Sequence, residues 1–201
     1  NIDDLKAQVS ANQKGIRALL EASERFGARI LCDAMAQLID YAEMQIRSVI
    51  RRLRNGCFTL RFDNGAILSV SIVIDRDAGS CEIDFSGTSP ALENNFNCPV
   101  SVVHAAVLYV FRTLVDDDIP LNQGCLRPIR IKIEPGSMLA PEYPSAVVAG
   151  NVETSTCLVN ALFGALGVMA SAQPTMNNLS FGDDGHQYYE TVSYTHLRAH
   201  E

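Results

Sequence analysis

The sequence contains no tryptophan, no Cys-x-x-Cys pair and no extended run of basic residues. Its 201 residues include 16 lysines and arginines against 23 aspartates and glutamates, which gives a net charge of −7. Binding to nucleic acid depends on clustered positive charge that neutralises phosphates. The charge balance therefore argues against nucleic acid as a partner, and the short basic cluster at residues 51–54 is too local to change this.

Long hydrophobic runs are missing as well. No apolar run reaches the roughly 18 residues that a membrane-spanning helix needs, and the first residues do not resemble a secretory signal. We therefore expect a cytoplasmic protein with no membrane partner. The hydrophobic fraction of 47% supports a packed core. Because the chain opens without methionine and directly in a helical pattern, we expect an internal fragment of a longer protein.

Motifs of dedicated nucleotide and metal sites do not occur. The patterns GxxxxGK[ST] and GxGxxG are absent, and no carboxylates and histidines have the spacing of metal ligands, so we expect no metal site in this segment. His104 lies in an apolar stretch and is predicted to be a core histidine. Most of the six cysteines are predicted to be small core residues in a reducing compartment. They are Cys32, Cys57, Cys81, Cys98, Cys125 and Cys157.

Hydrophobic periodicity divides the first half of the chain into helices and strands. Spacings of three and four residues predict two helices, the second antiparallel to the first, with Gly27 between them. Alternation with a period of two then predicts a three-stranded antiparallel meander with tight turns. The helices are expected over residues 5–20 and 35–53, and the strands near residues 58–62, 70–74 and 81–85.

The second half mixes the same two periods. Residues 99–115 are too apolar for a surface helix and are predicted to form a helix in the core. A strand near residues 129–133, a helix over 154–170 and short strands at 177–181 and 187–191 follow. The predicted fold class is α+β, an antiparallel β-meander with packed helices that is part of a larger domain.

The last ten residues, VSYTHLRAHE, continue none of these patterns. They match, codon by codon, the translation of a transposase adapter used in short-read sequencing libraries. We therefore expect a native partial domain over residues 1–191 and a non-native tail over residues 192–201. His196 and His200 are excluded as candidate ligands or bases for this reason.

Four segments contain more polar residues and glycines than packing requires. The first, at residues 85–90, has the composition of an ordinary glycine turn. The second, at residues 119–125, provides Asn122 and Gly124 as candidate substrate-binding residues, and an Asx-type turn explains them equally well.

The third segment, at residues 146–155, has the strongest signal, because a glycine and polar residues come directly before an apolar helix. Gly150 permits close approach of a ligand to the backbone, and amides at a helix start can hold an anion or a developing oxyanion. We predict catalytic roles for Asn151, Glu153 and Thr154. An Asn or Thr cap with an acidic first turn is the structural alternative.

The fourth segment, at residues 176–182, contains the adjacent amides Asn177 and Asn178. These side chains either bind substrate or satisfy a buried turn. Taken from the residues alone, the four segments indicate amide-rich loops without a complete catalytic set.

The same segments make the chain similar to the hydantoinase B/oxoprolinase family. Residues 1–15 resemble that family's DLxAQxAAN segment, and later family motifs are matched in the same order. The matched segments are residues 84–88, 119–125, 147–155, 176–178 and 188–191. Through the last of them, the resemblance implies substrate-binding roles for Tyr189 and Glu190.

The resemblance implies one half of an ATP-dependent cyclic-amide hydrolase. In the family, an A-type half uses ATP to phosphorylate the amide oxygen of a five-membered ring. The B-type half, which this chain resembles, opens the activated ring with water to give the linear amino acid. The substrate implied is 5-oxoproline, as in glutathione metabolism, or a hydantoin, and the opening segment is most similar to the oxoprolinases.

The resemblance also implies cofactors and partners. The full-length enzyme is expected to need ATP and a divalent metal, Mg with Mn or Zn as further candidates, bound outside this segment, so the isolated chain is expected to be inactive. The implied partners are the hydantoinase A-type ATP-binding half, on the same chain or a separate one, the cyclic amide, and further copies in a homo-oligomer. Two alternatives stay open: an acetone carboxylase-type large subunit, which is a ligase, and a non-catalytic assembly subunit.

Overall fold

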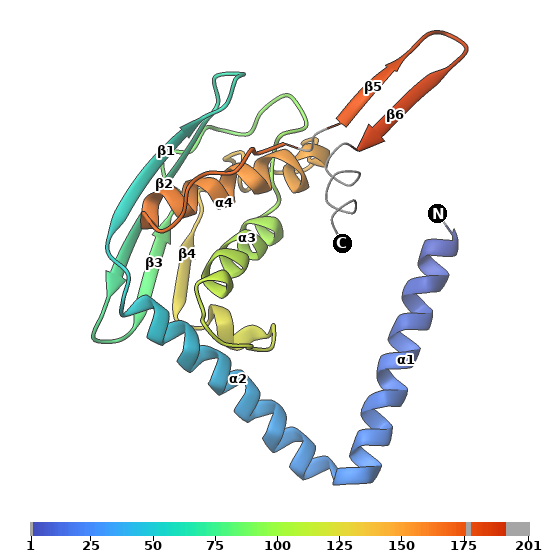
Figure 1. Cartoon of the computed structure of the whole chain (residues 1–201), viewed down its shortest axis with the longest axis vertical. Coiled ribbons are helices and arrows are strands. Elements are labelled where there is room, and N and C mark those ends of the chain that lie inside the picture. The colour runs from blue at the N-terminus through green and yellow to red at the C-terminus, as the bar shows by residue number, and fades with distance from the viewer. Residues whose placement is uncertain (1, 176–177, 192–201) are drawn as a thin grey trace, which may run out of the picture.

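A four-stranded sheet covered by two helices forms the body of the molecule (Figure 1). The computed structural model describes residues 2–175 and 178–191. The predicted meander is confirmed: each strand pairs antiparallel with the next, Phe58 facing Val70 and Ile72 facing Ile83. Its strands are β1 (Gly56–Arg61), β2 (Ile67–Asp75) and β3 (Ser80–Asp84).

The fourth strand, β4 (Ile129–Lys132), lies parallel to β3, with Ile131 opposite Ile83. Alternation predicted this strand but carries no information on its direction. The chain reaches it through α3 (Val100–Thr113) and the short 3-10 helix η1 (Gln123–Leu126), a crossover of the kind that parallel strands require.

The core lies between one face of the sheet and the helices α3 and α4 (Glu153–Leu166) (Figure 1). Alternate residues of the strands point into it because successive side chains of a strand face opposite sides. The predicted core helix is confirmed, but His104 lies on the exposed face of α3, so its prediction as a core residue was wrong. Fully buried large side chains include Leu68, Ile72, Ile83, Phe85, Phe111, Leu158 and Leu162.

Four of the six cysteines belong to buried positions, as predicted for most of them. Cys32 and Cys57 are exposed instead. Burial raises the pKa of the Cys81 and Cys98 thiols to about 12, which makes both of them inert small core residues.

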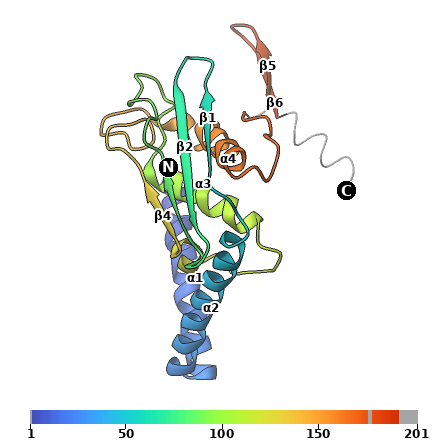
Figure 2. The ribbon, with the colours of Figure 1, turned by 90° about the vertical axis from the view of Figure 1, so that its left-hand side faces the viewer.

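The N-terminal helices α1 (Ile2–Phe26) and α2 (Ala28–Ile50) form an arm that extends from this body (Figures 1 and 2). Gly27, with a φ of 86°, is the single residue between them. The helices diverge from this corner, so the predicted antiparallel packing was wrong (Figure 1). An αα-hairpin needs a loop of roughly two to five residues, which this connection does not provide. None of the residues of α1 is buried, whereas the second half of α2 contributes Ala42, Ile46, Val49 and Ile50 to the core.

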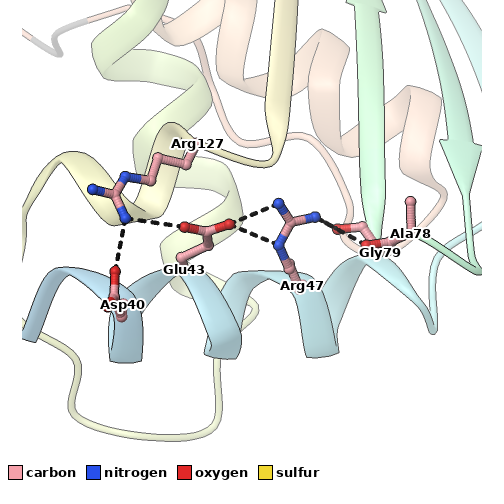
Figure 3. A network of polar contacts seen from close by, with 6 residues as sticks. All are labelled: Asp40, Glu43, Arg47, Ala78, Gly79 and Arg127. Carbon is pink, nitrogen blue, oxygen red and sulfur yellow. Dashed lines mark hydrogen bonds and ion pairs between the residues drawn. The ribbon is translucent and has the colours of Figure 1, made fainter. Parts of the chain in front are cut away.

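An ion-pair network joins α2 to the body (Figure 3). Glu43 accepts hydrogen bonds from Arg47 at 2.9 and 2.7 Å and pairs with Arg127 at 3.2 Å. Arg127 also pairs with Asp40, and Arg47 donates to the carbonyl oxygens of the β2–β3 turn. The hydrogen bond from Arg47 holds the pKa of the Glu43 carboxyl below its usual value, with a further contribution from Arg127.

The two predicted C-terminal strands are confirmed as β5 (Asn178–Gly182) and β6 (Gln187–Thr191). They form an antiparallel hairpin that projects away from the four-stranded sheet (Figure 1). The predicted non-native tail at residues 192–201 lies outside the described residues, so that prediction remains untested. No described helix combines the length and the apolar character that crossing a membrane would require.

Candidate active site at the start of helix α4

Helix α4 begins without a side-chain cap. Its N-cap residue is Val152, which cannot accept a hydrogen bond through its side chain, and none of the described side chains caps the helix. The alternative of an Asn or Thr cap is therefore wrong, while the acidic first turn is present as Glu153. The positive end of the helix dipole therefore lies at a start without a side-chain cap, with the Glu153 carboxylate in its first turn.

Asn151 ends the 3-10 helix η2 (Val148–Asn151) directly before α4. Its side chain is exposed and, within residues 2–175 and 178–191, makes no hydrogen bond. It lies at the edge of a hollow of about 380 Å³ between α3 and α4. Apolar side chains of α3 form one wall, and the segment around Gln173 closes another. The wall residues from the helices are Val102, Ala105, Ala106, Tyr109, Ser155, Thr156, Val159 and Asn160.

Glu153 is half-buried on a different side of the same helix start. It lines a second hollow, of about 660 Å³, together with Arg61 and Asp63, and accepts a hydrogen bond of 2.7 Å from the Thr175 hydroxyl. Burial, with the charges of Glu153 and Asp63 adding to it, raises the pKa of Cys157 in this wall to about 11. The structure therefore places Asn151 and Glu153 on adjacent hollows, and Gln173 lines both.

The third predicted catalytic residue, Thr154, is fully buried. Its hydroxyl donates a hydrogen bond of 2.6 Å to the carbonyl oxygen of Phe96. Within this structure the hydroxyl ties α4 to the loop before α3 and is not open to either hollow.

Gly150 lies where two segments of the protein approach each other closely. A Cβ atom at this position would lie 2.1 Å from the carbonyl oxygen of Asn97 and 2.9 Å from the Cα atom of Cys98. Gly150 therefore allows two segments of the protein to approach closely, and the predicted approach of a ligand to this backbone remains a prediction.

Asn97 connects several loops near the start of α4, and the sequence analysis did not identify it as a candidate. It is fully buried, accepts a hydrogen bond from the Leu92 amide, and donates to the carbonyl oxygens of Leu92, Asn94 and Ala146. Its amide thus joins the loop before α3 to the segment that leads into α4. The sequence feature that could have drawn attention to Asn97 is its position close to two further asparagines, at residues 94–95.

A strap of residues 172–175 runs along one face of α4. The amide of Asn160 both donates to and accepts from the backbone of Ala172, at 2.8 and 3.0 Å. The Thr156 hydroxyl donates to the carbonyl oxygen of Pro174 at 2.6 Å, and Glu153 accepts from Thr175. These three residues lie three or four positions apart on the helix, so they share one face. The strap leads towards the β5–β6 hairpin.

The predicted site residues of that hairpin are only partly described. Asn177 lies outside the described residues, and Asn178 and Glu190 are placed by backbone pairing in β5 and β6. Tyr189 is exposed on β6 and pairs with Ser180. Their predicted substrate contacts therefore remain predictions.

The second predicted segment is used for structure. Asn122 accepts a hydrogen bond of 2.8 Å from the Gly124 amide, which is the Asx-type turn of the alternative prediction, and donates to the Leu38 carbonyl oxygen. A Cβ atom on Gly124 would lie 1.9 Å from the carbonyl oxygen of Ile39. Both residues hold η1 against α2. Neither has a spare hydrogen-bonding group in the way that Asn151 does.

The described residues do not fit a metal ion. Among residues 2–175 and 178–191, no group of three or more histidine, cysteine, aspartate or glutamate side chains is arranged to hold one. No step of the chemistry is therefore assigned to a metal held by this segment.

Comparison with known proteins assigns the chain to a family. The sequence model described as Hydantoinase B/oxoprolinase matches residues 1–196. The chain belongs to this family. The 5-oxoprolinase 1 of Arabidopsis thaliana is 39% identical over 208 aligned residues, which cover 96% of this chain and 16% of that protein. The chain thus spans a small part of the length of this relative.

Two solved structures share the fold of this hydantoinase B-type chain, which confirms the predicted fold class. An ATP-dependent caprolactamase from Pseudomonas jessenii superposes with a TM-score of 0.66 at 20% identity, over 94% of this chain and 35% of that chain. A nucleotide-free acetone carboxylase superposes with a TM-score of 0.62 at 13% identity, over 75% of this chain and 22% of that chain.

Proposed function

We propose that this chain is part of the hydrolytic half of an ATP-dependent cyclic-amide hydrolase of the cytoplasm, with 5-oxoproline as the preferred substrate. A hydantoinase A-type half, on the same polypeptide or a separate subunit, activates the amide oxygen with ATP. The B-type half then opens the ring with water to give the linear amino acid. The support is the identity of 39% with a plant 5-oxoprolinase over almost the whole chain.

The start of α4 is the proposed site of ring opening. The observation behind this proposal is an uncapped helix start beside an asparagine whose side chain is exposed and makes no hydrogen bond within the described residues. Backbone amides and a side-chain amide are the donors that stabilise negative charge on an amide oxygen. Asn151 supplies the side-chain donor, and the dipole of α4 favours the same charge.

Glu153 has a separate proposed role at the neighbouring hollow. Its carboxylate holds Thr175 and thereby the strap that leads to Asn177 and Asn178. Glu153 thus positions the amide-bearing hairpin relative to α4, while Asn151 contacts the substrate. The proposed full enzyme needs a divalent metal as well, held by residues outside this segment, so the segment alone is proposed to be inactive.

The test is an assay of the natural full-length gene product together with its A-type half. We expect ATP-dependent formation of glutamate from 5-oxoproline, measured by amino-acid analysis, with no reaction when ATP is omitted. ATP-dependent turnover of acetone with bicarbonate, and none of 5-oxoproline, would assign the protein to the ligase class instead. No turnover of any substrate, with an intact fold, would favour a non-catalytic assembly subunit.

A further inference from the structure

The strap of residues 172–175 forms a wall of both hollows at the start of α4. Its first two residues line the hollow at Asn151, and its last three line the hollow at Glu153. None of the four residues is buried, so the strap contributes no side chain to the hydrophobic core. Its position therefore shapes both hollows without being fixed by core packing.

Side chains of α4 hold the strap in place through four hydrogen bonds. Two of them belong to Asn160, which donates to the carbonyl oxygen of Ala172 at 2.8 Å and accepts from its amide at 3.0 Å. The Thr156 hydroxyl adds a bond of 2.6 Å to the carbonyl oxygen of Pro174. Segments with few buried contacts open at a lower free energy than the core. Loss of these bonds should therefore release the strap and leave α4, which has many buried residues, folded.

Asn160 has the largest share in this attachment. It is only 5% exposed and lines the same hollow as Asn151. Its side-chain nitrogen and oxygen are both used on the backbone of Ala172, so Asn160 acts on the contents of the hollow through the strap. Asn122 makes the same pair of bonds, one to a carbonyl oxygen and one from an amide, but lines neither hollow.

We propose that Asn160 is a positioning residue for substrate binding, because it fixes the strap as the wall against which the substrate lies in the hollow at Asn151. The inference rests on the proposed function, which supplies the cyclic amide as the substrate. Asn151 acts on the amide oxygen during ring opening. Asn160 contributes to affinity through the strap and not to the chemical step.

Steady-state kinetics of the natural full-length enzyme with its A-type half separate these two roles. We expect Asn160→Ala to raise the KM for 5-oxoproline about tenfold or more and to leave kcat within about threefold of the parent. The reason is that the wall is released while Asn151 stays in place. Asn122→Ala is the matched control, because it loses the same pair of bonds away from the hollows, and its KM should equal that of the parent.

A pair of threonine variants provides a milder version of the test. The hydroxyls of Thr156 and Thr113 both donate to carbonyl oxygens three and four residues earlier in their helices, but only Thr156 also bonds the strap. Both residues are exposed, so replacement by the similarly shaped valine should leave the fold intact. We expect Thr156→Val to raise KM about threefold and Thr113→Val to leave it unchanged. This pair decides the question if Asn160→Ala does not fold.

Hydrogen exchange provides a readout that does not depend on activity. The Ala172 amide is protected by its bond to Asn160, so Asn160→Ala should accelerate exchange in a peptide covering residues 169–175. Exchange in peptides of α4 should stay as in the parent.

Three outcomes would count against the proposal, and they are distinguishable. Faster exchange of the strap with an unchanged KM would show that the strap is no wall of the substrate site, while the proposed function would stand. Equal changes of KM and kcat in Asn160→Ala and Asn122→Ala would reduce Asn160 to a structural residue. A parent enzyme that turns over no 5-oxoproline would contradict the proposed function, and this inference with it.

Discussion

Two segments that each contain a glycine and an asparagine have different uses in this protein. Residues 119–125 and 146–155 each combine a glycine with an asparagine next to a helix, and both match family motifs. In the first segment, the Asn122 side chain uses both its nitrogen and its oxygen in hydrogen bonds to backbone groups. In the second, the side-chain amide of Asn151 makes no hydrogen bond within the described residues. Spare hydrogen-bonding capacity at an exposed position, more than composition, therefore marks a candidate functional residue.

The glycines of the two segments give the largest expected effect. In both, an added Cβ atom would meet a carbonyl oxygen of a distant segment at about 2 Å, 1.9 Å for Gly124 and 2.1 Å for Gly150. We expect Gly124→Ala and Gly150→Ala each to reduce the free energy of unfolding by about 3 kcal/mol or more, since backbone must move. Gly15→Ala, in open space on α1, is the control and should stabilise the protein by about 0.5–1 kcal/mol. Urea denaturation measures all three, and a Gly150→Ala variant as stable as the parent would contradict the steric explanation for that glycine.

The network of Figure 3 tests how firmly the first segment is held on α2. Glu43 is 21% exposed and lies between Arg47 and Arg127, the latter directly after η1. We expect Glu43→Gln to cost about 1–2 kcal/mol of unfolding free energy, because two guanidinium groups lose their shared carboxylate. Asp40→Asn, at a carboxylate that is 72% exposed, should cost less than about 0.5 kcal/mol. Equal losses for the two variants would contradict a central role for Glu43.

A third family motif, at residues 84–88, allows a test by pH. The Lys132 ammonium, with the Ser86 hydrogen bond adding to it, lowers the pKa of the Asp84 carboxyl to about 2. Because the folded-state pKa lies below the ordinary value, this carboxylate stabilises the fold above about pH 4, and the contribution is lost as the pH falls towards 2. Asp84→Asn should lower the unfolding free energy at pH 7 by about 0.5–1 kcal/mol, after allowance for solvent screening, and leave it nearly unchanged at pH 2. Asp77→Asn, in the exposed β2–β3 turn, is the control. If Asp84→Asn lowers the unfolding free energy equally at both pH values, the ionic explanation is excluded.

The sequence predicted most of the elements because each has a clean period. The alternation at Phe58, Val70 and Ile72 and the apolar stripe of α3 are local patterns, and the structure confirms the strands and the helix that they predicted. The Asx-type turn at Asn122 was likewise readable, since asparagine before glycine favours it.

The remaining features depend on contacts between segments far apart in the chain. The direction of β4, the divergence of α1 from α2 and the exposure of His104 follow from tertiary packing, which local spacing does not encode. The hub formed by Asn97 and the close approach at Gly150 involve residues about fifty positions apart. For the same reason, the sequence suggested that Asn151, Glu153 and Thr154 form one site. In the structure, Asn151 and Glu153 line two separate hollows and the Thr154 side chain is buried in the core.

The most direct test of the account compares Asn151→Ala with Asn122→Ala in the natural full-length enzyme, with melting temperature and kcat measured on the same preparations. Asn122→Ala should cost about 1 kcal/mol of stability or more and leave kcat within about threefold of the parent. Asn151→Ala should leave the melting temperature unchanged and lower kcat by roughly 10²–10³, which corresponds to about 2.7–4 kcal/mol of transition-state stabilisation. A lowered melting temperature for Asn151→Ala with kcat within about threefold of the parent would contradict a catalytic role for the start of α4.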